Sequence, residues 1–386
     1  MTERTIVEAA ARLRRQGEPY LVATVVCVTG SAYRRPGARM LLTRFRWIAG
    51  SVSGGCLEGD ISTKGWWRTQ NGSPVVVRYD SRVPEHADDD DVRAAFGLGC
   101  DGVVEVMLER AGTGAPSGRI DPLELANECT RTQRRAAVAT VFRSELADVP
   151  VGARIAVHAG GEPYGDALPD AVRDALAAEL RGAVECGRSA TRSIRTAGGT
   201  IEACIEALLP PPRLFVLGTG HDAVPVVDAA RALGWDVVVA TPRPRVSIRQ
   251  RFAHADDVVV ATPDEIGARI DECDRAMAIV MSHNYELDRA HLGALVASRA
   301  RYIGVLGPRA RTTRMSGELG LPDGDSRVHA PLGLELGAET PQEIALAAIA
   351  EIQAVLARSP GASLRDRIGP IHDRPTGEIE PAAAAG

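Results

Sequence analysis

The segment that follows Pro210–Pro212 constrains the fold of this chain more than any other feature. Apolar runs such as RLFVL, WDVVVA, DDVVVA and RAMAIVMS alternate there with stretches of helical character. Alternation of strands with helices is typical of a parallel sheet that helices cover on both faces. Because proline cannot donate the hydrogen bonds of a sheet ladder, the run of three prolines also predicts a domain boundary.

A glycine turn, GTGHDA, follows the first of these runs and opens a helix. Gly218, Gly220 and Ala223 form a G-x-G-x-x-A pattern, in the context that the dinucleotide fingerprint requires. Gly218 permits the tight turn, Gly220 lets a phosphate approach the backbone, and Ala223 lets the helix pack closely on the sheet. We therefore predict a Rossmann-like domain whose glycines either bind a dinucleotide or serve packing alone.

The residues at the end of the second strand help to decide whether this domain binds a dinucleotide. A site for NAD places Asp or Glu there to hold the ribose hydroxyls, but this chain has Thr241 followed by Arg243 and Arg245. The two arginines are either candidates for the 2′-phosphate of NADP or solvated surface residues.

Two further loops follow strands of the same domain. His283 and Asn284 begin one loop, with Asp288 a helical turn further on, and the other loop carries Arg309 and Arg311. Because ligands bind at the carboxyl ends of parallel strands, we predict that His283 and Arg309 contribute to a site. A capping role for His283 and a basic surface loop at Arg309 are the alternatives.

At 386 residues the chain is long for one core. We predict an α/β protein with an N-terminal α+β domain over 1–209, a Rossmann-like domain over 213–357, and a mostly irregular tail over 358–386. Thr340, Pro341 and Glu343 have the spacing of a capping box that opens the last helix.

Composition excludes several classes of protein. A net charge of −5 argues against a nucleic-acid-binding surface, and no apolar run approaches the ~20 residues of a membrane span. The N-terminal segment lacks the apolar core of a signal peptide, which predicts a cytoplasmic protein. The seven cysteines contain no CxxC pair, so a disulfide scaffold or a zinc ribbon is not expected.

Two glycine-rich loops each contain a cysteine. GSVSGGCLEGD, residues 50–60, surrounds Cys56 and precedes a helix that we expect Ser53 to cap. FGLGCDG, residues 96–102, surrounds Cys100 and precedes a strand. A thiol flanked by glycines is accessible, and one near a helix N-terminus tends towards thiolate, a nucleophile or a soft metal ligand. The alternative is that both cysteines are small packing residues.

Taken in order, GSVSGGCLEGD, GLGCDG, LGTGHDAVPVV, SHNYELD, YIGVLGPRAR and APLGLELGAETPQEIALAAIAEI resemble the XdhC/CoxI family. These are accessory proteins of molybdenum hydroxylases such as xanthine dehydrogenase and aerobic carbon monoxide dehydrogenase. The resemblance implies a chaperone that binds molybdenum cofactor, as molybdopterin or its cytosine dinucleotide form. It also implies that the chaperone supports sulfuration of the cofactor by a cysteine desulfurase and delivers it to the apo-hydroxylase, often as a dimer or larger assembly.

Under this interpretation Cys56 is the functional thiol and a candidate molybdenum ligand, and Cys100 is a second functional thiol. The residues expected to contact the cofactor are Gly54, Gly55, Cys56, Glu58, Gly99, Gly218, Gly220, His221, His283 and Arg309, and Asp60 is a further candidate for hydrogen bonds to the pterin.

The chain departs from the family pattern at Asp101, where a second glycine is common, and at Thr241, where an acid is common. The first departure adds a negative charge beside Cys100, and the second weakens any site for NAD. An oxidoreductase that uses NADP or a flavin through the C-terminal domain is the main alternative. An interaction scaffold is a third interpretation, against which the paired glycine–cysteine loops argue.

Overall fold

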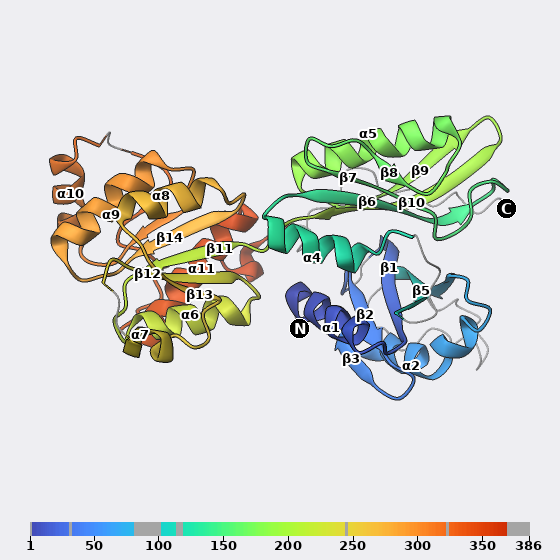
Figure 1. Ribbon diagram of the computed structural model, residues 1–386, viewed down its shortest axis with the longest axis horizontal. Helices are drawn as coiled ribbons and strands as arrows, with labels where there is room; N and C mark the ends of the chain where they lie inside the picture. The colour runs from blue at the N-terminus through green and yellow to red at the C-terminus, as the bar shows by residue number, and fades with distance from the viewer. Residues whose placement is uncertain are drawn as a thin grey trace. The chain divides into compact units, whose positions relative to one another are not determined.

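The computed structural model of the chain (Figure 1) describes residues 2–30, 33–80, 102–112, 119–243, 246–321 and 324–368. The chain divides into two compact units that meet at Leu209 and Pro210, and each unit has hydrophobic clusters of its own. No helix within the described ranges is long and apolar enough to cross a membrane.

The described residues of the first unit form two antiparallel sheets of five strands, ordered β3-β2-β1-β5-β4 and β8-β7-β6-β10-β9. Successive side chains of a strand point to opposite faces, so β1 sends Leu21 and Ala23 to one core and Tyr20 and Val22 to another. The strands are β1 (Tyr20–Gly30), β2 (Arg39–Leu42), β3 (Trp47–Gly50), β4 (Val75–Asp80), β5 (Gly102–Ala111), β6 (Ala136–Ser144), β7 (Arg154–His158), β8 (Tyr164–Gly165), β9 (Ala190–Thr196) and β10 (Gly199–Leu208).

Two helices of this unit, α1 (Glu3–Arg15) and α4 (Pro122–Thr132), lie between the sheets and share a core with both. Helix α2 (Cys56–Arg68) covers the other face of the first sheet, and α5 (Asp170–Cys186) covers the other face of the second (Figure 1). The unit is therefore layered, with helices outside each sheet and between the two.

A buried ion pair joins the two sheets. Nη2 of Arg39 in β2 lies 2.7 and 2.6 Å from the carboxylate oxygens of Glu206 in β10. Both side chains are 4% exposed. Arg154 in β7 and Glu109 in β5 make a second bridge of 2.6 Å between the same sheets. Because an unpaired charge at this depth is costly, each member of a pair depends on the other.

The second unit contains a parallel sheet with the order β13-β12-β11-β14-β15-β16, counted over its described residues. The Rossmann-like fold predicted for this part of the chain is confirmed. Its strands are β11 (Arg213–Leu217), β12 (Asp236–Thr241), β13 (Asp257–Val260), β14 (Ala276–Val280), β15 (Ile303–Val305) and β16 (Val328–His329).

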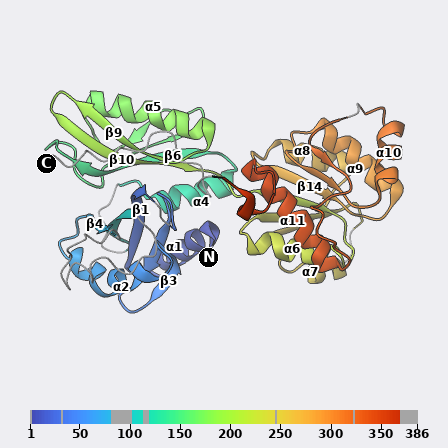
Figure 2. The same ribbon diagram turned by 180° about the vertical axis from the view of Figure 1, so that it is seen from behind.

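Helices cover both faces of this sheet. One face packs against α6 (Ala223–Ala232), α7 (Val246–Arg251) and α11 (Pro341–Ala357), as Figure 2 shows. The other packs against α8 (Pro263–Asp271), α9 (Tyr285–Ala297) and α10 (Arg309–Glu318), and a 3₁₀ turn (Leu364–Asp366) follows α11. The predicted capping box of α11 is confirmed, because Thr340 accepts from the N–H of Glu343 while Glu343 accepts from the N–H of Thr340.

The order in which strands are added to the sheet changes direction beside β11. From β11 the chain proceeds to β12 on one side, and after β13 it crosses back to β14 on the other side of β11. The carboxyl ends of β11 and β14 therefore flank a topological switch point, which is where ligands of open α/β sheets bind.

The buried pair between the sheets gives a stability test. Replacing Glu206→Leu should lower the free energy of unfolding by about 3–5 kcal/mol, because Arg39 then stays buried without its partner. The double variant Arg39→Met/Glu206→Leu should recover most of that loss, since neither desolvated charge remains. Urea unfolding followed by circular dichroism measures both differences.

The control for this test is Glu179→Leu, which breaks a partly exposed pair with Arg192 in the same unit. Its cost should stay at or below about 1 kcal/mol, as for other surface pairs. A Glu206→Leu variant no less stable than this control would contradict the role given to the buried pair.

Candidate functional site

The first candidate site is the glycine–cysteine loop between β3 and α2. Gly50 ends β3 with φ +76°, and a Cβ there would lie 2.1 Å from the carbonyl oxygen of Arg39, so only glycine fits. Gly55 is the N-cap residue of α2, at φ +127°, a conformation that side chains rarely adopt. The helix begins at Cys56, so Gly55 and not Ser53 is its N-cap residue, although Ser53 Oγ accepts the N–H of Leu57 in the first turn as a cap would.

Ser53 instead organises the loop from inside. Its Oγ accepts hydrogen bonds from the N–H groups of Gly55 and Leu57, each at 3.1 Å, and donates its own hydrogen to Glu58. Oε1 of Glu58 accepts from the N–H groups of Val52 and Ser53, at 3.0 and 2.8 Å. Glu58 was predicted to contact a cofactor, and in this structure its carboxylate holds the turn in place.

The charge of Glu58 is maintained although the residue is only 3% exposed. Burial by itself would raise the pKa of the carboxyl, but the hydrogen bonds from Ser53 and Val52 outweigh it, so the pKa lies below its ordinary value. Asp60 has a lowered pKa for a related reason: ion pairs with Arg68 and Lys64 and a hydrogen bond from Tyr79 outweigh the effect of burial.

Cys56 is exposed and is the first residue of α2. Its Sγ lies 3.7 Å from Ser53 Oγ. A Cβ added at Gly55 would meet nothing within 4 Å, and one added at Gly54 would meet only the ring of Tyr33 at 4.0 Å. The backbone before the thiol is therefore open to a ligand.

Arg34 adds a positive charge beside this loop, which the sequence reasoning missed. Its Nη2 donates to Ser51 Oγ at 2.6 Å, and its guanidinium lies 5.4 Å from the centre of the Tyr33 ring. Its Nε is buried and has no hydrogen-bond partner among the described residues. The adjacent arginines Arg34 and Arg35, which follow a glycine and a serine in the sequence, were the available signal. A loop that carries a soft thiol, an open glycine backbone and a contact with a cation suits an anionic ligand with a soft metal centre.

The second predicted loop cannot be placed beside the first. Gly99, Cys100 and the neighbouring Asp101 lie outside the described residues, as does the acidic run Asp88–Asp91. Gly102 is the next described residue, and β5 begins there and runs antiparallel to β1. Elsewhere in the described ranges, no group of three or more His, Cys, Asp or Glu side chains is arranged to hold a metal ion.

The second candidate site is the carboxyl edge of the parallel sheet, where Gly218, Gly220 and His283 come together. A Cβ on Gly218 would lie 2.3 Å from the carbonyl oxygen of Met281, so glycine is required for the loops after β11 and β14 to approach. A Cβ on Gly220 would lie 2.2 Å from Asp222 Oδ1 and 3.8 Å from the His283 ring. Sequence reasoning missed Asp222, whose Oδ2 lies 2.7 Å from His283 Nε2.

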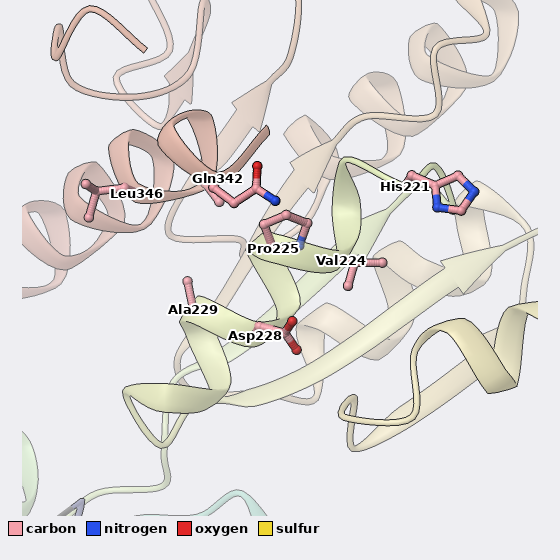
Figure 3. A pocket seen from close by; sticks show the side chains of 8 residues that line it. His221, Val224, Pro225, Asp228, Ala229, Gln342 and Leu346 are labelled. Carbon is pink, nitrogen blue, oxygen red and sulfur yellow. The ribbon is translucent and has the colours of Figure 1, made fainter. Parts of the chain in front are cut away.

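The other residues predicted for this domain are more scattered. His221 lines a pocket of about 500 Å³ between α6 and α11, together with Val224, Pro225, Gln342 and Leu346 (Figure 3). Arg309 is exposed at the first turn of α10. At the end of β12, Thr241 accepts a hydrogen bond from the N–H of the exposed Arg243, and Arg245 lies outside the described residues.

The lowered pKa of Glu58 predicts a pH-dependent contribution to stability. A carboxylate with a lowered pKa stabilises the fold fully above its unfolded value of about 4.3 and loses that contribution as the pH falls through the folded value. Glu58→Gln should therefore cost about 1.5–3 kcal/mol at neutral pH, and its difference from wild type should shrink below about pH 4.3. Urea unfolding at a series of pH values measures this.

Glu185→Gln, on the exposed surface of α5, is the matched control and should stay within about 0.5 kcal/mol of wild type. If the Glu58→Gln difference does not change with pH, the charge of Glu58 is not what holds the loop.

Comparison with known proteins places both sites in one family. Residues 13–80 match the model of the XdhC and CoxI family, and residues 214–352 match the model of the XdhC Rossmann domain. Together the matches cover more than half of the 386 residues.

Two relatives align with this chain over different fractions of its length. A Bacillus subtilis (strain 168) protein, named as a probable subunit of xanthine dehydrogenase, is 29% identical over 335 residues, which is 87% of this chain and 92% of that protein. The Escherichia coli (strain K12) "Uncharacterized protein YqeB" is 31% identical over 169 residues, which is 42% of this chain and 31% of the relative.

A solved structure shares the whole fold. A crystal structure described as a xanthine dehydrogenase from Bacillus halodurans superposes with a TM-score of 0.71 at 24% identity, covering 94% of this chain and 98% of that one. The glycine–cysteine loop lies within the first matched region and the glycine turn after β11 within the second. With both matched regions in the expected order, this chain belongs to the XdhC and CoxI family.

Proposed function

We propose that this chain is an accessory protein of a xanthine dehydrogenase or carbon monoxide dehydrogenase type enzyme and acts as a chaperone for its molybdenum cofactor. The accessory role is supported by family membership and by the Bacillus subtilis relative, whose name refers to xanthine dehydrogenase and which aligns over most of both chains. The chaperone role rests chiefly on one observation, the exposed Cys56 thiol on an open glycine loop.

The residues of this loop fit such a cargo. The soft sulfur ligand of Cys56 suits a molybdenum centre. The uncovered backbone at Gly54 and Gly55 leaves room for a flat pterin, and a Cβ at either position would enter that space. The Arg34 guanidinium and the N-terminus of α2 both favour the negative charge of the cofactor phosphate. Glu58 positions these groups from behind the loop.

The proposed partners are the proteins that would modify the bound molybdenum cofactor or receive it. A cysteine desulfurase supplies sulfur to the cofactor while the chaperone holds it, and the apo-hydroxylase receives the finished cofactor. We place these events in the cytoplasm and expect the chaperone to form homo-oligomers. Cys100 and Gly99 are proposed to contribute to the same task.

The direct test is retention of the cargo. Protein purified from cells that make molybdenum cofactor should carry both molybdenum, measured by mass spectrometry of the metal, and a pterin, measured by the fluorescence of its oxidised product. Protein from cells that cannot make the cofactor is the control. Equal, background amounts of both in the two preparations would overturn the proposal.

The role of the thiol is tested separately. Cys56→Ala removes little volume, so its stability should stay within about 1 kcal/mol of wild type, while activation of the client enzyme in a deletion strain should largely be lost. Cys186→Ala, which removes another exposed thiol of the same unit, should keep both properties. Full client activity with Cys56→Ala would mean that the thiol only contributes to the fold of its loop.

A further inference from the structure

The glycine turn after β11 is where a Rossmann-like domain would take a dinucleotide. In such sites the second glycine leaves a space beside the backbone, and the pyrophosphate of the ligand enters that space at the helix N-terminus. In this chain the second glycine is Gly220, and the helix is α6. Whether the residues present fit a dinucleotide depends on what occupies the space beside Gly220.

That space already holds a side chain of this protein. Asp222 Oδ1 lies 2.2 Å from the position that a Cβ of Gly220 would take, and the ring of His283 lies 3.8 Å from it. Asp222 is the N-cap residue of α6 and makes no capping hydrogen bond with its side chain. Its carboxylate therefore takes the place of a bound anion, where the partial positive charge of the helix N-terminus favours it.

The position of Asp222 is held from the neighbouring strand. His283 Nε2 bonds to Asp222 Oδ2 at 2.7 Å across the switch point. His283 has φ +60°, a conformation that costs energy for a residue other than glycine and persists only where the surroundings enforce it.

The residues on each side of His283 hold its backbone in this conformation. Ser282 Oγ donates to Asp288 at 2.5 Å, and the side chain of Asn284 caps α9 by accepting from the N–H of Leu287. Asp288 is 1% exposed and forms an ion pair of 2.7 Å with Arg311 of α10. The His283–Asp222 pair is thus supported by the loops after β11 and β14 and by α9 and α10.

The end of β12 also does not fit NAD. Thr241 stands where the ribose-binding acid is required, and its hydroxyl accepts a hydrogen bond from Arg243 within the same turn. The ribose position is therefore unsuited to NAD, and the case against NADP and FAD rests on the pyrophosphate position beside Gly220.

We propose that Asp222, held by His283, closes this glycine turn to pyrophosphate, so that the Rossmann-like unit does not take NAD, NADP or FAD. The switch point instead presents an imidazole backed by a carboxylate. With Nε2 engaged by Asp222, Nδ1 is the ring nitrogen that faces a ligand, and the side chain is 59% exposed. The fitting ligand is one that forms a hydrogen bond with the His283 ring and places no phosphate on the turn. This inference is independent of the role proposed for Cys56.

The test removes the carboxylate and asks whether pyrophosphate can enter. ADP-ribose and NADP⁺ are titrated calorimetrically into the full chain as wild type, Asp222→Ala and Asp228→Ala. The last is the matched control, since Asp228 carries the same charge on the same helix but pairs with His254 away from the turn. We expect Asp222→Ala to bind ADP-ribose at least about tenfold more tightly than wild type or the control, because a like charge no longer fills the site.

Two results would overturn the proposal: micromolar binding of either ligand by wild type, or no gain for Asp222→Ala over Asp228→Ala. Thermal melting of each variant shows whether it is folded. If Asp222→Ala does not fold, Asp222→Asn decides the matter, because it keeps the shape and removes the charge. It should show a smaller gain in affinity, and no gain would again overturn the proposal.

Discussion

The glycine–cysteine loop depends on the buried ion pair between Arg39 and Glu206. The guanidinium of Arg39 is tied to the second sheet, while its backbone carbonyl lies against Gly50, the residue that ends β3 and begins the loop. Met40 and Gly50 are partners in the same ladder. Cys56 follows Gly50 by six residues. The position of the thiol therefore depends on how the two sheets pack. Separating the two partners would leave an uncompensated buried charge on each sheet, which is what fixes this arrangement as long as both charges are present.

Both glycine turns of this protein contain a carboxylate of their own, with opposite consequences. Glu58 lies behind its loop and accepts N–H groups that would otherwise be unsatisfied, which leaves the outer side at Gly54 and Gly55 open. Asp222 lies on the side from which a ligand would approach Gly220 and fills it. Glycine-rich sequence alone therefore does not distinguish an available backbone from an occupied one. What distinguishes them is the side of the turn on which the carboxylate lies.

Much of the fold could be predicted from local sequence. Buried parallel strands appear as continuous apolar runs, which is why the Rossmann-like unit was recognisable after Pro210–Pro212. The capping box at Thr340 was predictable because its partners are three residues apart. Ser53 was assigned the wrong position because Gly55 adopts a positive φ and delays the start of α2, although Ser53 still accepts the N–H of Leu57.

The residues alone determined the strands and helices of the Rossmann-like unit, the presence of the glycine turns and the family, because periodicity and short-range hydrogen bonds involve neighbours in the chain. Only the tertiary structure decided which side chains meet at those turns. Arg39 and Glu206 are 167 residues apart, and Asp222 and His283 are 61 apart. No local pattern relates such positions. Their contacts follow from strand order and sheet packing, and these depend on how the whole chain buries its apolar faces and pairs its buried charges.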